Sequence, residues 1–271
     1  MKLVFIGGGN MASAMIGGLL RQGWQAGDIA VVDIAAEARE RIAKATGVRA
    51  CADIAGGLAG AECVIFAVKP QQLRATAQAV APLLQGRLVV TIAAGIRSGD
   101  LARWLGNHER IVRAMPNTPA LVLAGMSGLY ARPAVTSADR DAAQRILGAA
   151  GKTLWLDREE QIDAVTAVSG SGPAYVFYFL EALEDAARAQ GFDAAAARQL
   201  ALQTVAGSVK LAAESSEPPS VLRARVTSKG GTTERGIAVL EARTMKAIVD
   251  EAVAAAARRS RELGDELGAD T

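Results

Sequence analysis

A glycine-rich turn near the beginning of the chain constrains the fold more than any other feature. The short apolar run Leu3–Ile6 leads into three glycines, Gly7–Gly9, and a helical pattern begins at Asn10. The spacing fits G-x-G-x-x-A, in which Ala12 lets the helix pack closely on the strand. An apolar strand, a glycine turn and a helix in this order are typical of the first unit of a nucleotide-binding fold.

This turn is predicted to hold the phosphates of a dinucleotide. Gly7 allows the tight turn, and Gly9 lets the backbone approach a pyrophosphate, with Gly8 between them. The backbone N–H groups of Asn10 and Met11, at the start of the helix, then face the anion. The alternative is a glycine-rich turn that binds nothing.

Short apolar runs alternate with helical stretches through the first two-thirds of the chain. The predicted strands are Leu3–Ile6, Ile29–Val32, Cys63–Val68, Leu88–Ile92 and Ile111–Ala114, with weaker candidates at Met126–Tyr130 and Thr153–Leu156. The predicted helices between them are Asn10–Arg21, Ala35–Ala45 and Pro70–Leu84. Continuous apolar strands, each followed by a helix, indicate a parallel sheet that is buried on both faces. The pattern predicts a doubly wound, Rossmann-like α/β domain.

The pattern changes near residue 160, after which the sequence predicts helices and no strand. The predicted helices are Pro173–Ala189, Ala194–Glu214, Thr232–Glu241 and Met245–Leu263, and Ser215–Ser220 is predicted to be a loop. We therefore expect a dinucleotide-binding domain over residues 1–160 and an all-α domain over residues 161–271. The alanine-rich inner face of the last helix suits packing in a helix bundle or in a dimer interface, and a surface helix of a monomer is the alternative.

Composition and charge exclude several classes of protein. The net charge is +2 without a long basic run, so nothing indicates nucleic-acid binding. Two cysteines, Cys51 and Cys63, cannot build a disulfide framework and favour a reducing compartment. The single histidine, His108, leaves no His-based metal site and no Ser-His triad. The sequence contains neither an apolar stretch of roughly 18 residues nor a signal-peptide pattern, so we expect a cytoplasmic protein.

An acidic residue ends the second predicted strand. Asp33 stands where an acid in this fold bonds the adenosine ribose hydroxyls and repels a 2′-phosphate, which favours NAD. The alternative role of Asp33 is to cap the helix that begins near Ala35. Arg39 and Arg41 follow on that helix, too far along to be expected as phosphate clamps.

Two further strand ends carry candidate cofactor-binding residues. Ala67-Val68-Lys69-Pro70 closes the third predicted strand and places Lys69 at the carboxyl edge of the sheet, where ligands bind in this fold. Ala93-Ala94-Gly95 follows the next strand, and these small residues would let a nicotinamide ring approach. Ordinary connecting loops are the alternative for both segments.

Six motifs carry a resemblance to a known family. They are GGGNMA at 7–12, FAVKP at 66–70, AAG at 93–95, MPNTP at 115–119, SGSGPAYVF at 169–177 and VTSKGGTTERGIAVLE at 226–241. The first is generic to nucleotide-binding folds, whereas the last is specific. In this order, and over nearly the whole chain, they resemble the pyrroline-5-carboxylate reductases.

The resemblance implies an activity and an assembly. The expected reaction is the reduction of 1-pyrroline-5-carboxylate to L-proline by NADPH or NADH, the last step of proline biosynthesis. The expected architecture is a Rossmann domain followed by a helical domain through which subunits dimerise, often assembling further into rings. The two halves of each active site are then expected to come from different protomers, with Ser169–Gly172 as the hinge between domains.

The substrate of that reaction is a cyclic imine with a carboxylate. Its protonated form is already electrophilic at carbon, so catalysis rests mainly on positioning and electrostatics. The turn before residue 234 has two glycines followed by hydroxyl residues at a helix start, which exposes N–H donors. The resemblance assigns Thr233 to the ring nitrogen, and Ser228, Gly230, Gly231 and Thr232 to the carboxylate. A well-capped helix start is the alternative.

The sequence departs from the family at three positions. Lys229 stands where relatives often have proline, which makes the turn less rigid and more basic. Asp33 stands where NADPH-using relatives often have serine, and Ile54 where an asparagine is common. We therefore predict appreciable use of NADH.

Two other functions compete with this one. A β-hydroxyacid dehydrogenase needs an acid/base lysine on the first helix of its second domain, because reduction of a ketone develops an alkoxide. The predicted helix Pro173–Ala189 contains no lysine. A non-enzymatic scaffold or sensor is the second alternative, but it has no need for the carboxylate-binding turn.

Overall fold

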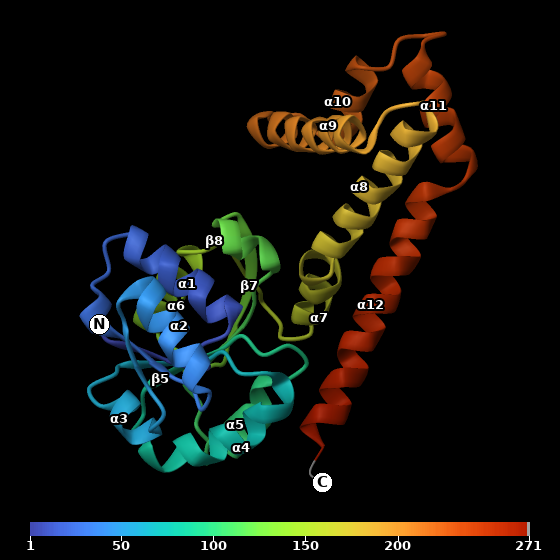
Figure 1. Ribbon diagram of the computed structural model, residues 1–271. Coiled ribbons are helices and arrows are strands. Elements are labelled where there is room, and N and C mark those ends of the chain that lie inside the picture. Colours follow the sequence, from blue (N-terminus) through green and yellow to red (C-terminus); the bar gives the residue numbers. More distant parts are fainter. Residues whose placement is uncertain (270–271) are drawn as a thin grey trace. The chain divides into compact units, whose positions relative to one another are not determined.

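A computed structural model describes residues 1–269 and divides the chain into two compact units (Figure 1). The first, the sheet unit, comprises residues 1–171 together with the chain from Ala255 onward. The second, the helical unit, is Gly172–Ala254. These limits differ from the predicted boundary at residue 160, because Ile162 and Ala167 are buried on the sheet unit and the end of the last helix returns to it.

One eight-stranded sheet organises the first unit, in the order β3-β2-β1-β4-β5-β6-β7-β8. All neighbouring strands are parallel except β6 and β7, which are antiparallel. The strands are β1 Leu3–Ile6, β2 Ile29–Val32, β3 Arg49–Cys51, β4 Cys63–Phe66, β5 Leu88–Thr91, β6 Ile111–Met115, β7 Gly125–Ala131 and β8 Gly151–Trp155. The predicted strands are confirmed, although β4 ends two residues early, β8 begins two residues early and several other limits differ by one residue. The sequence missed β3, which is three residues long and lacks a fully buried residue.

Helices cover both faces of the sheet. They are α1 Asn10–Arg21, α2 Ala36–Thr46, α3 Ile54–Leu58, α4 Pro70–Val80, α5 Ser98–Trp104, α6 Ser137–Gly148 and α7 Gln161–Val165. Successive strand residues alternate between the faces. Phe5 packs into one core with α1, α2 and α6, whereas Val4 and Ile6 pack into the other with α3, α4 and α5. The sheet is therefore buried on both sides, as its continuous apolar strands predict.

Short helical turns complete this unit. Three are 3-10 turns, η1 Ala26–Asp28, η2 Ala81–Leu83 and η3 Thr118–Val122, and η4 Thr166–Gly170 is a π-helical turn. The π turn lies directly before the limit between the two units.

The helical unit contains α8 Gly172–Ala189, α9 Ala194–Glu214, α10 Pro219–Arg225, α11 Thr232–Ala242 and the first part of α12 Met245–Gly268. The sequence missed α10, which begins inside the predicted loop with Pro219 at a first-turn position, where proline is tolerated. Helices α8, α10 and α11 have no buried residue. Within the described residues, no helix is long and apolar enough to cross a membrane.

Candidate active site

The carboxyl ends of β1, β4 and β5 meet at one edge of the sheet. These strands are parallel neighbours, and β1 has β2 on its other side, so the order of strands reverses between β1 and β4. Open α/β sheets bind ligands at such a switch point. The structure therefore brings three predicted segments to one edge: Gly7–Met11, Ala67–Pro70 and Ala93–Gly95.

Gly7 and Gly8 lie so close to the ends of β4 and β2 that a side chain would crowd those ends. Gly7 has a φ of +105°, and a Cβ there would lie 2.7 Å from the carbonyl oxygen of Ala67. Its N–H donates to the carbonyl of Val32 at 2.7 Å. A Cβ on Gly8 would lie 3.3 Å from Val31 Cγ1, so a side chain at either glycine would push the turn away from the neighbouring strand ends.

The beginning of α1 is open for an anion. Gly9 has nothing within 4 Å of an added Cβ, and it caps the helix without a side-chain hydrogen bond. The first turn contains no acidic residue. Within residues 1–269, no acceptor takes the N–H groups of Asn10, Met11 or Ala12. This arrangement fits the pyrophosphate of a dinucleotide.

Asp33 ties the end of β2 to the glycine turn. Its carboxylate accepts the N–H of Gly8 at 2.7 Å and the N–H of Ala35 at 2.9 Å. The N-cap of α2 is Ala35, which makes no side-chain capping bond of its own. Asp33 therefore bonds the backbone at the start of α2 without being its N-cap residue, and its carboxylate also lies at the switch-point edge.

Two arginines reach this edge, which corrects the expectation that they lie too far along their helix. Arg39 Nη1 donates to the carbonyls of Asp33 and Ile34, both at 2.9 Å. Arg41 Nη2 donates to the carbonyl of Gly8 at 3.0 Å. Helical side chains point back toward the N-terminus, so residues in the early turns of α2 return to the strand end. The sequence signal for this arrangement is the pair of arginines early in the helix that follows Asp33.

Lys69 and Pro70 form the start of α4. Lys69 is its N-cap and has an extended backbone, and Pro70 occupies the first turn. The N–H of Ala67 bonds to the carbonyl of Ile6 at 2.8 Å, which holds this loop beside the glycine turn. Lys69 is exposed, and no bond partner is found for its amine among the described residues. In the described chain its cation is therefore unpaired, at the edge where open α/β sheets bind ligands.

The loop after β5 is closely packed. Ala93 and Gly95 are buried, and Gly95 has a φ of +71°. The N–H of Ala93 bonds to the hydroxyl of the buried Thr91 at 3.3 Å. The backbone of this loop thus forms a fixed wall at the ligand edge.

Two motifs without an assigned role meet in the sheet unit. The side-chain amide of Asn117 donates to the carbonyl and to the hydroxyl of Ser169, both at 3.1 Å. Its carbonyl oxygen accepts the N–H of Met126 at 2.8 Å. These bonds join the MPNTP motif after β6 to the π turn, whose backbone they help to satisfy.

The second candidate segment lies in the helical unit, at the start of α11. Gly230 has a φ of +73°, and a Cβ on Gly231 would lie 2.5 Å from Ser228 Oγ. No side chain caps the helix. In the described chain, the N–H groups of Thr232 and Thr233 have no hydrogen-bond acceptor. The turn therefore presents free donors, and the well-capped alternative is wrong.

A carboxylate of this chain already contacts that turn. Glu234 Oε2 accepts the N–H of Gly230 at 2.7 Å. An internal carboxylate at this position indicates that the turn attracts negative charge.

Fold and edge together define a class of protein: a nicotinamide-dinucleotide-dependent oxidoreductase with a separate helical unit. The family model described as NADP oxidoreductase, coenzyme F420-dependent, matches residues 2–95. The model described as pyrroline-5-carboxylate reductase dimerisation matches residues 159–263.

Similar proteins narrow the class to one family. Pyrroline-5-carboxylate reductase of Pseudomonas aeruginosa is 46% identical over 268 residues and covers 98% of each chain. The solved pyrroline-5-carboxylate reductase of Coxiella burnetii superposes with a TM-score of 0.93 at 38% identity, over 97% of this chain and 98% of that one. The pyrroline carboxylate reductase of Plasmodium falciparum, solved with NADP bound, superposes with a TM-score of 0.86 at 30% identity. The match covers 97% of this chain and 98% of that one.

The chain belongs to the pyrroline-5-carboxylate reductase family. It is an NAD(P)H-dependent oxidoreductase that reduces 1-pyrroline-5-carboxylate to L-proline, the final step of proline biosynthesis. It carries the dimerisation domain of that family.

Proposed function

We propose that the imine is reduced between the switch-point edge of one protomer and the 228–233 turn of its partner. The observation that carries this proposal is a pair of uncapped helix N-termini, one in each unit. That of α1 offers N–H groups for a pyrophosphate, and that of α11 offers them for a carboxylate. The two ionic groups that the reaction brings together thus each have a matching site.

In this reaction the protein mainly binds and orients the substrate and the cofactor. Bound NAD(P)H supplies the hydride that the imine carbon accepts. In this proposal, Thr232 and Thr233 N–H groups and Ser228 Oγ bind the substrate carboxylate. Glu234 holds the N–H of Gly230 and so keeps the turn in shape. The Thr233 hydroxyl orients the ring nitrogen and is the catalytic residue.

The small residues Ala93–Gly95 form the wall for the nicotinamide in this proposal, and Gly7–Met11 hold the pyrophosphate. Val68, Lys69 and Pro70 complete the cofactor edge from β4. The buried backbone at Ala93 and Gly95 supports this assignment, because a nicotinamide ring must be held within reach of the imine.

Substitution of Thr233 tests the substrate site. Thr233→Ala should lower kcat/KM for the imine by roughly 10- to 100-fold, the effect of losing one hydrogen bond to a charged group. Thr233→Ser keeps the hydroxyl and should restore most of the activity. Steady-state kinetics with a size and melting-temperature check on each variant is the measurement. Unchanged kinetics in Thr233→Ala would remove this residue from the site.

The choice between the two cofactors tests the β2 end. We predict that NADH supports appreciable turnover, because Asp33 places a carboxylate at the ribose position. Arg39 lies at the same position, so Arg39→Ala should lower kcat/KM with NADPH more than with NADH. Lys44→Ala, in the last turn of α2, is the matched control and should change neither. A wild-type preference for NADPH by orders of magnitude contradicts the assignment to Asp33.

We infer two further properties from the resemblance and the composition. Dimers are proposed to assemble into a larger ring, which mass measurement of the native protein decides. The protein is proposed to be cytoplasmic, in keeping with two free cysteines. Cell fractionation tests that location.

A further inference from the structure

We propose that the final turns of α12 are a positioning element for the cofactor loop between β5 and α5. The proposal rests on the assignment of Ala93–Gly95 to the nicotinamide wall. Helix α12 begins in the helical unit, but from Ala255 onward it belongs to the sheet unit. Its last turns therefore pack with this loop in one compact unit.

A stripe of small residues lets the helix approach closely. Ser260, Gly264 and Gly268 are spaced four residues apart, so they lie on one face of α12. Ser260 and Gly264 are buried. A Cβ on Gly264 would lie 3.2 Å from Arg97 Nε, and one on Gly268 would run into the carboxylate of Asp100. Larger residues on this stripe would push the helix off the segment that follows the loop.

Apolar contact reaches the loop itself. A Cβ added to Gly95 would lie 3.2 Å from Leu263 Cβ and 3.3 Å from Leu267 Cδ1. Leu267 also packs against the core beneath α3, α4 and α5. The backbone of Gly95 is thus pressed between the sheet edge and two leucines of α12.

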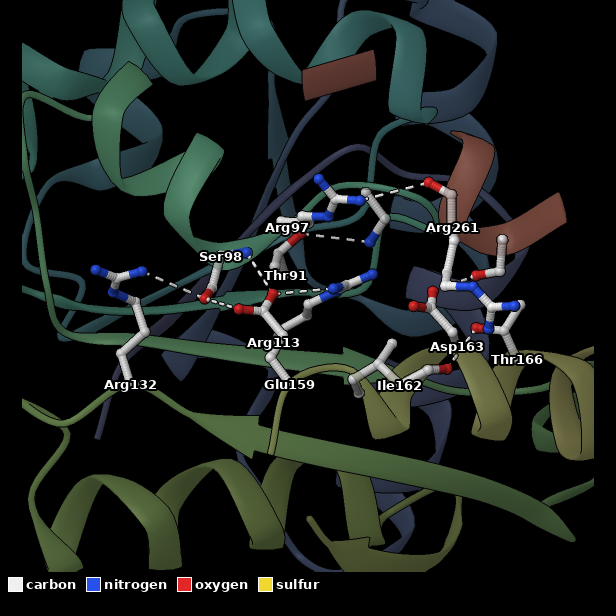
Figure 2. Close-up of polar contacts among 12 residues, drawn as sticks. Thr91, Arg97, Ser98, Arg113, Arg132, Glu159, Ile162, Asp163, Thr166 and Arg261 are labelled. Atoms are coloured by element: carbon white, nitrogen blue, oxygen red, sulfur yellow. Dashed lines mark hydrogen bonds and ion pairs between the residues drawn. The ribbon is translucent and has the colours of Figure 1, made fainter. Parts of the chain in front are cut away.

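Polar bonds fix the same face. Arg97 Nη2 lies 2.5 Å from Asp265 Oδ1. It also lies 3.5 Å from the carbonyl oxygen of Arg261 (Figure 2). Ser260 Oγ donates to Asp163 Oδ1 at 2.6 Å. The hydrogen bond to Asp265 raises the pKa of Arg97 above its usual range. These bonds tie α12 to Arg97, the last residue of the loop, and to Asp163 of α7.

The loop is held from its other end as well. Glu159 accepts the N–H and the hydroxyl of Ser98, each at 2.6 Å, and pairs with the buried Arg113 at 2.9 Å (Figure 2). Because Glu159 holds Ser98 and β5 ends at Thr91, the stretch of the loop between these two fixed points is residues 92–97. This is the part that α12 contacts. The helix end therefore controls the stretch that faces the cofactor, and its loss should act on cofactor binding.

Two substitutions on α12 test the proposal. Leu267→Ala removes the Cδ1 methyl that packs at Gly95 and should raise KM and Kd for NAD(P)H on the order of tenfold. Asp265→Asn removes an exposed ion pair and should raise them about twofold. In both, kcat at saturating cofactor and KM for the imine should stay near wild type. Glu266→Gln is the matched control and should change nothing, because Glu266 pairs with Arg259 of the same helix and with no other group of residues 1–269.

Amide hydrogen exchange supplies a second readout. In the cofactor-free protein, Leu267→Ala should speed exchange in residues 92–97 and leave the glycine turn at 7–11 unchanged. Unchanged cofactor affinity with unchanged exchange overturns the proposal, as does a uniform fall of all parameters with loss of the dimer. Failure of the underlying assignment looks different: NAD(P)H would then fail to slow exchange at 92–97 in the wild-type protein.

Discussion

The two units of this chain solve the burial of apolar surface in opposite ways. In the sheet unit, Phe5 and Phe66 are completely buried, because helices cover both faces of the sheet. In the helical unit, Phe177 is 64% and Tyr178 75% exposed on α8. Contiguous exposed apolar surface of this kind marks an interaction site. The comparison teaches that the sheet unit is complete within one chain, whereas the helical unit needs a partner.

The exposed apolar surface extends over the other helices of that unit. A cavity of about 470 Å³ is lined by residues of α10, α11 and α12 and the residues between α11 and α12, among them Ile237, Leu240, Met245 and Val249. The dimerisation model of the family spans this region. A second copy of the chain is therefore the expected cover, as obligate interfaces resemble a domain core cut in half.

The largest expected effect comes from charging the exposed face. Phe177→Asp should weaken the dimer on the order of 100-fold or more, the scale of a lost interface hot spot, and activity should fall with it at low protein concentration. Phe177→Leu keeps the face apolar and should remain dimeric. Light scattering after gel filtration, alongside turnover, is the measurement. A fully active, dimeric Phe177→Asp protein would contradict the contrast between the units.

A smaller effect is expected from the sheet core. Phe5→Ala should lower the free energy of unfolding of the sheet unit by about 3–5 kcal/mol, the usual cost of truncating a buried phenylalanine. Since this core is complete in one chain, the loss should not depend on protein concentration. Denaturant unfolding at two concentrations measures both points. A concentration-dependent loss would mean that the partner also supports this core.

The smallest expected effect is a difference in reactivity between the two cysteines of the sheet unit, which tests how well its core is closed. Cys63 on β4 is fully buried, and this burial raises the pKa of its thiol far above the usual range. Cys51 at the end of β3 is half-buried. Near neutral pH a thiol reagent should therefore modify Cys51 in the native protein and reach Cys63 only after unfolding. Equal rates at the two cysteines in the folded protein would show that the sheet core opens readily.

Prediction from sequence succeeded where one local pattern decides the structure. The helix Asn10–Arg21 and the strands Leu3–Ile6 and Ile29–Val32 were predicted with the limits that the structure has. Apolar runs, turn glycines and helix starts carry these limits locally. The short strand β3 and the helix α10 were not predicted, because neither has a clear apolar period and their positions depend on neighbouring elements.

The candidate site divides in the same manner. Gly7 and Gly230 were recognisable, because a turn with positive φ favours glycine wherever it folds. The place of Arg39 in α2 predicts a side chain too far along to reach the ligand edge. That prediction is wrong, because the side chain turns back to the strand end. No sequence signal pointed to Leu263 or Asp265, which approach Gly95 and Arg97 only through the return of α12.

The sequence by itself determined most of the strands and helices along the chain, the glycine turns and the family, since these follow from local chemistry and from motifs in a fixed order. The tertiary structure alone decided which distant residues share an edge: Arg39 beside Asp33, Glu159 beneath Ser98, and α12 against the loop at Gly95. The physical reason is that such contacts depend on how whole elements pack, and packing depends on shape complementarity summed over many residues.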